Sequence, residues 1–256
     1  MVFILISQLN LMELNKIYEE DCLATLSRMQ DNSIDLVVTS PPYNKGAYAD
    51  GAQCKNWTQL DGGKIAYDTY EDSMAPEEYE AWQKKLISEC IRVLKPSGSL
   101  FYNHKDIISD GLIVHPKWVY DFPVREVIIW DRGSGPQISN RYFMPANEYI
   151  WWIVKDPKQV YFDKDKSAYR TNIWRVNVEK NPHPAPFPQK LVNSIIASCS
   201  PTNGVVYDPF MGSGTTALCT INVGGGRSYV GSEISHTYVK MAEDRIKIEQ
   251  SQLTLF

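Results

Sequence analysis

The residues whose types and spacing best suit ligand chemistry lie in the stretch VVYDPFMGSGTT, residues 205–216. An apolar run leads to Asp208, then to a turn with Gly212 and Gly214, and then to the start of a predicted helix. Glycine lets the backbone approach a ligand closely, and α/β sheets bind ligands at the carboxyl ends of parallel strands. A second strand, in YVGSEIS, ends on Glu233, where an acid suits hydrogen bonding to ribose hydroxyls. Together these stretches predict a site for a nucleoside-containing cofactor.

The spacing of the glycines narrows the choice of cofactor. It is not Gly-x-Gly-x-x-Gly, and the lysine of a phosphate-binding P-loop is absent. A nucleoside without a pyrophosphate is therefore favoured over a nicotinamide cofactor or a triphosphate. Taken alone, the glycines are also explained by a tight turn between a strand and a helix that binds no ligand.

A second polar stretch ends the apolar run in IDLVVTSPPYN, residues 34–44. Pro41 and Pro42 fix two φ angles and lack backbone donors, so the strand must stop there. The turn presents Tyr43 and Asn44 on a rigid support. The simplest explanation is a strand terminator with an exposed tyrosine.

Strands that alternate with helices would position both stretches, which indicates an α/β protein with a largely parallel sheet. The helix expected at 76–94 begins with Pro76 and keeps apolar residues at helical spacing. The other expected elements, in chain order, are a helix and then a strand within 19–40, strands at 95–104, 125–130 and 148–155, a helix at 187–200, a strand at 204–208, a helix at 213–224, a strand at 227–235 and a helix at 236–252.

We expect a single domain over residues 12–250. Residues 45–75 carry glycines and no period, and a loop of that length is usually functional. Residues 156–182 are charged, aromatic and weakly periodic, which makes them the candidate for an inserted element that reads the substrate. Residues 1–11 form either an edge strand or a tail.

The composition is that of a globular protein with one sizeable core, because 43% of the 256 residues are hydrophobic and 22% are charged. No apolar run reaches the roughly 20 residues that span a bilayer, and no signal peptide is recognisable. The cysteines show neither Cys-x-x-Cys nor metal-ligand spacing, so we expect reduced cytosolic thiols packed as small hydrophobes. These cysteines are Cys22, Cys54, Cys90, Cys199 and Cys219.

The net charge of -4 does not by itself indicate a nucleic-acid binder. A groove in an acidic protein can still be basic, and positive residues gather in one region of the sequence. They are Arg125, Lys155, Lys158, Lys164, Lys166, Arg170, Arg175 and Lys180.

Taken together, TSPPYN and DPFMGSGTT resemble the catalytic and cofactor motifs of the amino-group DNA methyltransferases that use S-adenosylmethionine. The resemblance extends to HPAPFPQKLVNSII (183–196), YEEDCLATL, RVLKPSGSLFY and YVGSEIS. The catalytic motif precedes the cofactor motif, with a variable segment between them, and this order is typical of the family's beta group. The resemblance implies a Rossmann-like methyltransferase fold with helices on both faces of the sheet, a circularly permuted motif order and a small inserted target-recognition segment.

By this resemblance, the SPPY turn holds the exocyclic amine of a base. That amine is a poor nucleophile because its lone pair is delocalised into the ring. The side chain of Ser40 and the carbonyl of Pro41 would accept its hydrogens, and Pro42 would help to keep these acceptors preorganised. Tyr43 would stack on a base flipped out of the duplex. Asn44 receives no role.

The resemblance also implies a set of cofactor residues. Glu233 would hold the ribose hydroxyls, and Asp21 would accept from the adenine amine, although Asp21 is equally explained as a helix cap. His183 and Pro186 would shape the methionine pocket; His183 is disfavoured as a general base, because the proton can leave to solvent. The residues expected around the methionine part are Asp208, Pro209, Phe210, Gly212 and Gly214.

Three other functions fit the sequence less well. A methyltransferase that acts on carbon 5 of cytosine needs a thiol after a proline, and the sequence contains no Pro-Cys pair. An inactive cofactor-binding module is disfavoured by the intact motifs. A methyltransferase of RNA, protein or small molecules is disfavoured by the basic and aromatic residues of 156–182, which suit stacking and phosphate contacts in nucleic acid.

The expected substrate is double-stranded DNA, and the expected compartment is the cytoplasm of a prokaryote or its phage, without membrane contact. Within the family, serine before Pro-Pro-Tyr is more frequent among enzymes that methylate N4 of cytosine, so Ser40 favours cytosine over N6 of adenine. At this stage three further questions are open: the recognition site, whether two copies form a homodimer, and whether a restriction endonuclease accompanies the enzyme.

Overall fold

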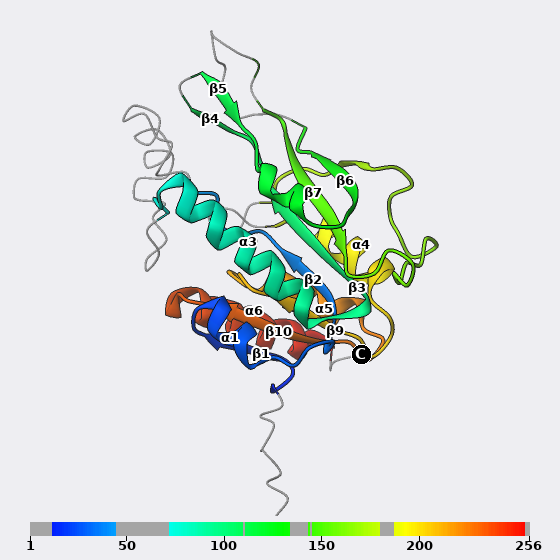
Figure 1. Cartoon of the computed structure of the whole chain (residues 1–256). Helices are drawn as coiled ribbons and strands as arrows, with labels where there is room; N and C mark the ends of the chain where they lie inside the picture. Colours follow the sequence, from blue (N-terminus) through cyan, green and yellow to red (C-terminus); the bar gives the residue numbers. More distant parts are fainter. Residues whose placement is uncertain are drawn as a thin grey trace, which may run out of the picture.

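The computed structural model describes residues 12–44, 72–109, 111–133, 143, 145–179 and 187–253. At its centre lies an eight-stranded sheet (Figure 1). In spatial order its strands are β1 (Lys16–Glu19), β10 (Ser228–Glu233), β9 (Val205–Asp208), β2 (Ile34–Thr39), β3 (Leu94–His104), β7 (Asn147–Val154), β6 (Val124–Asp131) and β8 (Ile173–Arg175). Five of the seven pairings are parallel, and β7 runs antiparallel to both of its neighbours.

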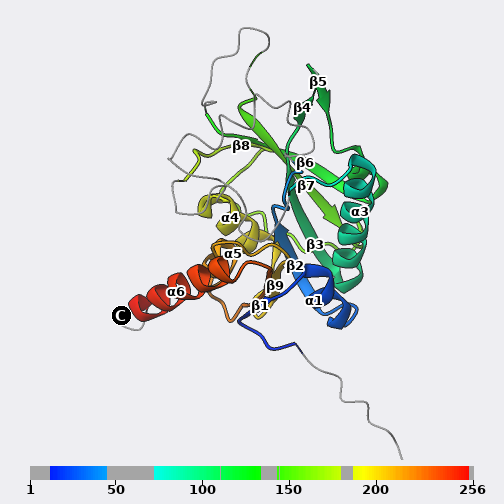
Figure 2. The same cartoon turned by 90° about the vertical axis from the view of Figure 1, so that its left-hand side faces the viewer.

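Helices cover both faces of this sheet (Figure 2). On one face lie α1 (Cys22–Arg28) and α3 (Pro76–Val93). On the other lie α4 (Gln189–Cys199), α5 (Thr215–Val223) and α6 (His236–Leu253). The predicted fold class, a mostly parallel sheet between two layers of helices, is confirmed. Among the described helices, none combines the length and the apolar character that crossing a membrane requires.

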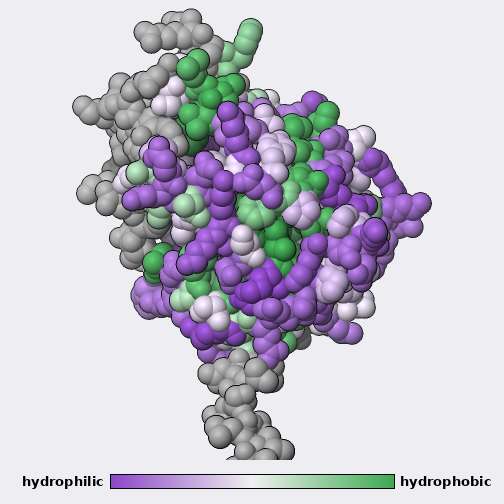
Figure 3. All heavy atoms as spheres, in the orientation of Figure 1, coloured by the Kyte–Doolittle hydropathy of each residue, from purple (hydrophilic) through white to green (hydrophobic). Residues whose placement is uncertain are grey.

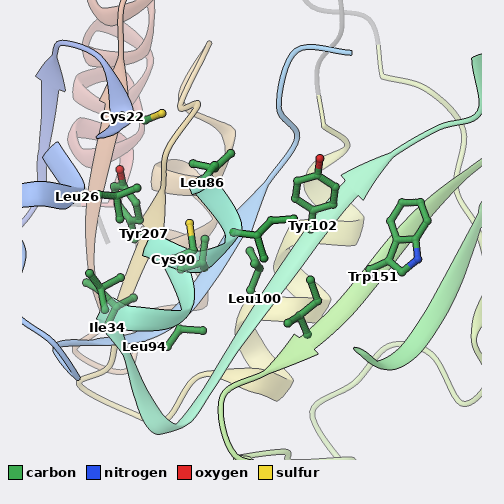
Figure 4. Close-up of a cluster of buried hydrophobic side chains, with 14 of the residues drawn as sticks. Cys22, Leu26, Ile34, Leu86, Cys90, Leu94, Leu100, Tyr102, Trp151 and Tyr207 are labelled. Carbon is green, nitrogen blue, oxygen red and sulfur yellow. The ribbon is translucent and has the colours of Figure 1, made fainter. Parts of the chain in front are cut away.

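Helix α3 shows how the sequence builds one of these layers. Pro76 occupies the first turn, where its missing N–H costs nothing, and Glu77 and Glu78 favour the positive end of the helix dipole. Apolar side chains on its inner face, among them Leu86 and Cys90, pack with residues from β2 and β3 (Figure 4). Burial of this face, rather than helix propensity, supplies most of the stability of the helix.

The four described cysteines are buried free thiols, as predicted. Cys22 and Cys90 belong to the same core cluster as α3 (Figure 4). Burial raises the pKa of the Cys22 thiol, which keeps it protonated and unreactive. Cys54 lies outside the described residues.

Several elements were not predicted from the sequence. These are β1, β8, the hairpin formed by β4 (Ile107–Ser109) and β5 (Leu112–Val114), and the short 3-10 helix η2 (Lys117–Asp121). Strand β1 has the sequence KIYE, which is too short to show a period, and it forms by parallel pairing with β10. The hairpin stands away from the sheet (Figure 1). Its apolar side chains Leu112 and Ile113 are exposed. Figure 3 shows green, hydrophobic residues at the top of the molecule, in the direction in which Figure 1 places the hairpin.

Two regions singled out in the sequence are described only in part. Residues 45–71 of the predicted long loop lie outside the described residues, as do residues 1–11. Within the segment 156–182, residues 156–179 are described; they run along the sheet and add β8 beside β6. Trp174 and Val176 of this segment are buried in a hydrophobic cluster with residues of β6, β7 and α4, which anchors the segment to the sheet.

The order of the strands reverses between β2 and β9. From β2 the chain passes through α3 to β3 on one side, and from β9 it passes through α5 to β10 on the other. Open α/β sheets bind ligands outside the carboxyl ends of the strands at such a reversal. Both polar stretches of the sequence follow these two strands directly, so the fold places them at this position.

Candidate active site

The two polar stretches meet through a buried hydrogen bond. Thr39 Oγ1, at the end of β2, donates to Asp208 Oδ1, at the end of β9, over 3.0 Å. Asp208 Oδ1 also accepts from the backbone N–H of Phe210 at 3.0 Å, and Oδ2 accepts from Thr216 Oγ1 at 2.6 Å. The carboxyl of Asp208 therefore connects the strand before the SPPY turn, the glycine turn and the first turn of α5.

Asp208 is 5% exposed, and its ionisation is perturbed. Burial raises the pKa of its carboxyl from an ordinary value of 3.8 to about 6, against the opposing effect of the donors from Thr216, Phe210 and Thr39. At neutral pH it is a buried anion whose hydrogen-bond partners, among the described residues, are neutral hydroxyl and N–H donors. Such a group is suited to receive a positively charged ligand.

The glycine turn has the tight geometry that the sequence predicted. Gly212 and Gly214 have φ angles of 52° and 83°, in the left-handed region that favours glycine. A Cβ on Gly214 would lie 2.8 Å from the Cβ of Ala242 in α6, so the glycine also permits close packing of that helix. Phe210 lies next to the turn and contacts Trp82 edge-on, with ring centroids 5.7 Å apart.

Glu233 ends β10, and Asp21 lies two residues after the end of the parallel neighbour β1, whose Glu19 pairs with Glu233. Glu233 Oε2 accepts from the N–H of Gly212 at 2.8 Å, which ties the acid to the glycine turn. Asp21 Oδ1 accepts from the N–H of Leu23 at 2.8 Å and caps α1. The helix-cap explanation of Asp21 is therefore present in the structure, on the same edge of the sheet as Glu233. His183 and Pro186 lie outside the described residues.

The SPPY turn lies beside this cofactor candidate. Tyr43 is only 8% exposed, and its hydroxyl lies 2.9 Å from Ser40 Oγ. Its ring packs against His104, with centroids 4.6 Å apart. The Pro42 carbonyl accepts from the hydroxyl of Tyr79 at 2.6 Å, which holds the turn against α3. Burial raises the pKa of Tyr79, so this donor keeps its proton.

Asn44 is the last residue of the turn, and its hydrogen bonds run toward the start of α3 rather than toward Ser40 and Tyr43. Its φ of 56° is left-handed, which asparagine tolerates better than most residues. Its backbone N–H donates to Asp72 Oδ1 at 2.6 Å, and its side chain donates to the Met74 carbonyl at 2.8 Å. Asn44 thus fixes the chain just before α3.

Three residues of this site were missed by the sequence reasoning. Asn103 Nδ2 lies 3.2 Å from Ser40 Oγ and 2.6 Å from Tyr43 Oη. Glu148 Oε2 accepts from Tyr43 Oη at 3.1 Å, and Arg132 pairs with Glu148 Oε1 at 3.0 Å. A polar pair at the end of the apolar strand LFYNH was a weak signal for Asn103. Glu148 and Arg132 carry no local signal.

The comparison with known proteins decides the family. A family model described as DNA methylase, of the N6 and N4 methyltransferase kind, matches residues 34–244. The chain belongs to this family. Its relatives include the type II methyltransferase M.ScaI of Streptomyces caespitosus, 30% identical over 93% of this chain and 83% of the relative. M.BglII of Bacillus subtilis is 32% identical over 90% of this chain and 68% of the relative.

Solved structures agree with this assignment at the level of the fold. The cytosine-N4-specific PvuII DNA methyltransferase matches with a TM-score of 0.67 at 19% identity, covering 94% of this chain and 92% of that one. M1.HpyAVI, solved with S-adenosylmethionine, matches with a TM-score of 0.62 at 20% identity, covering 90% and 98%. The protein is an S-adenosylmethionine-dependent DNA amino-methyltransferase, and its family includes both N4-cytosine and N6-adenine enzymes.

The basic residues that could bind DNA in this DNA methylase are not all available for it. Lys155 follows β7 at the ends of the strands opposite to the candidate site, where it donates to the carbonyls of Arg92 and Leu94 at 2.8 and 2.7 Å. The antiparallel β7 carries Lys155 away from the SPPY and glycine turns. Arg175 pairs with Asp131 at 2.7 Å and keeps an exposed side chain. Lys180 lies outside the described residues.

Proposed function

We propose that this DNA methylase transfers the methyl group of S-adenosylmethionine to N4 of a cytosine that has left the duplex. The observation that carries the proposal is the hydrogen bond between Thr39 and Asp208, because it joins the strand of the SPPY turn to the strand of the cofactor turn. Methyl transfer requires the amine and the methyl donor within one pocket, in line with each other.

The residues of the turn would hold the amine. Ser40 Oγ and the carbonyl of Pro41 accept the two hydrogens of the amine, which turns its lone pair toward the donor. The hydrogen bond from Tyr79 to Pro42 supports this role, since it keeps the turn rigid before the substrate arrives. Tyr43 contributes its ring to the wall of the base pocket.

The glycine turn and the acids around it would hold the cofactor, which supplies an electrophilic methyl group on a sulfonium. Asp208 is a buried carboxyl and suits the positively charged methionine portion. Gly212 and Gly214 let the backbone approach that portion, and Pro209 and Phe210 flank it. Glu233 would receive the ribose hydroxyls, and Asp21 the adenine amine. We also propose His183 and Pro186 for the methionine pocket.

The choice of cytosine depends on Ser40. Its hydroxyl stands where other members of this family carry aspartate, and serine is the more frequent residue among N4-cytosine enzymes. The relatives point to both bases: one solved neighbour is titled cytosine-N4-specific, and YhdJ of Escherichia coli, 27% identical over 92% of this chain, is named a DNA adenine methyltransferase. N6 of adenine is therefore the second candidate.

We assign the reading of the DNA sequence to residues 156–182. The described part of this segment lies beside β6 and carries an exposed charged side chain on Arg175 together with an exposed Phe162. Cationic and aromatic side chains supply phosphate and stacking contacts to DNA. Removal of the charge of Arg175 should weaken DNA binding and reduce its salt dependence.

Methylation of plasmid DNA followed by nucleoside mass spectrometry tests the proposal. We expect N4-methylcytosine with the wild-type enzyme and none with Ser40→Ala. N6-methyladenine would overturn the choice of base, and the absence of both would overturn the assignment of DNA as the substrate. Single-molecule sequencing of the same plasmid identifies the recognition sequence. Analytical ultracentrifugation of the enzyme bound to a DNA duplex with that sequence tests for a homodimer. An endonuclease that cleaves this site when unmethylated would identify the partner of a restriction-modification system.

A further inference from the structure

A buried chain of hydrogen bonds runs from the SPPY turn into the protein. Ser40 Oγ lies 2.9 Å from Tyr43 Oη, and Tyr43 Oη lies 3.1 Å from Glu148 Oε2. The other carboxylate oxygen, Oε1, pairs with the guanidinium of Arg132 at 3.0 Å. The chain thus connects a residue of the amine-binding turn to a carboxyl on β7 and an arginine just after β6.

The surroundings of Glu148 keep it in place as an acceptor. Glu148 is 6% exposed, and a buried carboxylate is tolerated only when it is paired and hydrogen bonded. Arg132 supplies the charge and is itself anchored on the Pro145 carbonyl at 3.1 Å. Asn103 Nδ2 donates to Glu148 Oε2 at 3.0 Å. Because a carboxylate can only accept, these contacts give the network a direction.

Glu148 determines which group donates in the hydrogen bond with Tyr43, and Tyr43 in turn determines which group donates in the hydrogen bond with Ser40. The hydroxyl of Tyr43 donates its single proton to Glu148, so its oxygen is left to act as an acceptor. The Ser40 hydroxyl, 2.9 Å away, then donates inward to Tyr43. A serine hydroxyl by itself both donates and accepts, and here its proton is committed to the protein side. Asn103 Nδ2 donates to one lone pair of Ser40 Oγ at 3.2 Å, so the second lone pair is left for an incoming N–H.

We propose that Glu148, paired with Arg132, is a positioning residue that makes Ser40 an acceptor for the amine of the target base. The inference depends on the proposed role of Ser40 and extends that role to two residues outside the family motifs. A serine that donated instead would compete for the lone pair of the amine, which must remain free to attack the methyl group. The buried network sets this polarity before the substrate binds, so no reorganisation is needed during the reaction.

The substitution Glu148→Gln tests the donor and acceptor roles in the hydrogen-bond network, because glutamine has nearly the same shape as glutamate. Arg132 only donates, so the amide oxygen of the glutamine must face it, and the amide N–H groups then face Tyr43. Tyr43 becomes a donor to Ser40, and Ser40 turns its proton toward the amine. We expect kcat to fall by about 10- to 100-fold, with the Kd for S-adenosylmethionine and the KM for DNA within twofold of wild type.

A double-mutant cycle separates this role from a structural one. Tyr43→Phe keeps the aromatic ring but removes the middle of the chain, so it should lower kcat to a similar extent. In the double variant Tyr43→Phe, Glu148→Gln the combined loss should fall short of the sum of the two single losses, because the Tyr43 hydroxyl no longer passes the change at Glu148 to Ser40, although Asn103 still contacts both residues. Adding Arg132→Met to Glu148→Gln should restore part of kcat, since the amide is then free to turn its oxygen toward Tyr43.

A matched control is Asp35→Asn. Asp35 is 5% exposed, pairs with Lys95 at 2.7 Å and accepts from the N–H of Val205, but it lies at the amino end of β2, far from the turn. It should lower the melting temperature while kcat stays at the wild-type value.

The proposal is overturned if Glu148→Gln keeps a kcat within twofold of wild type, or if its loss adds fully to that of Tyr43→Phe. If Glu148→Gln does not fold, Tyr43→Phe is the remaining test. A wild-type kcat for Tyr43→Phe would contradict the proposed role of the hydrogen-bond network from Glu148 to Ser40. A failure of the proposed function is seen separately, in the methylated nucleoside that the wild-type enzyme produces.

Discussion

The hydroxyl of Thr39 donates a hydrogen bond of 3.0 Å to Asp208, a residue 169 positions away in the sequence. Each residue ends its strand, and the two strands are parallel neighbours at the reversal of strand order. The bond is buried, so it holds the entry to the SPPY turn against the entry to the glycine turn. In the proposed function, the relative position of the amine and the methyl donor depends on this contact.

Thr39→Val removes the donor while keeping the shape of the side chain. The buried carboxyl of Asp208 then loses one of its hydrogen bonds, and we expect a loss of about 1–3 kcal/mol in the free energy of unfolding. Binding of S-adenosylmethionine should weaken as well. Thr39→Ser keeps the hydroxyl and serves as the control; urea denaturation and calorimetric titration compare the two. Equal stability of the valine and serine variants would contradict the role of the bond.

Asp208 predicts a pH dependence of cofactor binding. Its pKa of about 6 means that the folded protein takes up a proton there as the pH falls. S-adenosylmethionine is positively charged, so its affinity should be constant from pH 7 to 8.5 and fall by up to about tenfold per pH unit below 6. The Asp208→Asn variant should bind S-adenosylmethionine weakly at every pH in this range. A wild-type affinity of this variant would mean that the cofactor binds elsewhere.

The same residue predicts how stability depends on pH. Because its pKa is higher in the folded protein than its ordinary value of 3.8, the folded state retains the proton over a wider range. The contribution of Asp208 to stability is therefore complete below pH 3.8 and is lost as the pH rises through about 6. Unfolding of the cofactor-free protein should show this slope, and Asp208→Asn should lack it.

Tyr43→Ala should abolish most methylation while cofactor binding stays nearly intact. The ring packs on His104 after β2, which is the proposed base side, whereas the cofactor candidates Asp208 and Glu233 end β9 and β10. A methyl-transfer assay and a binding titration on the same preparation measure both properties. Parallel loss of both, in a variant that still melts cooperatively, would remove Tyr43 from the base pocket.

Asp21→Asn distinguishes the two roles of this residue. Asparagine caps a helix as well as aspartate does, so the stability should stay within about 0.5 kcal/mol of wild type. The carboxylate is lost, and if Asp21 accepts from the adenine amine, S-adenosylmethionine should bind about tenfold more weakly. An unchanged Kd would mean that Asp21 acts only as the cap of α1, a role for which the structure already shows the hydrogen bond from Leu23.

Gly214→Ala tests the packing beneath the cofactor turn. Both Gly214 and Gly111 have left-handed φ angles, 83° and 78°, so alanine costs roughly 1–2 kcal/mol of backbone strain at either position. Only at Gly214 does the new Cβ meet Ala242, which adds about 1–3 kcal/mol of overpacking. Gly214→Ala should melt well below Gly111→Ala, and equal melting temperatures would contradict the close contact of α5 and α6.

Local pattern was enough to predict the strands that carry the site and the turns that end them. Adjacent prolines end a strand wherever it lies, and closely spaced glycines after a strand predict a tight turn without reference to the rest of the sequence. The apolar runs before Thr39 and Asp208 therefore indicated both strands and the polar residues after them. The long helix α3 was equally readable, because its burial follows the helical period.

The neighbours of each strand were set by the tertiary structure alone. Glu148 is the second residue of β7, whose residues are mostly apolar, and it reaches Tyr43 because β7 runs antiparallel beside β3. Asn103 and Arg132 join it from two other strand ends, and the short β1 forms only because β10 offers an edge. Hydrogen bonds between distant segments depend on strand order and direction, which local sequence does not encode. The motifs were thus visible in the chain, while the network that orients them arose from packing of the sheet.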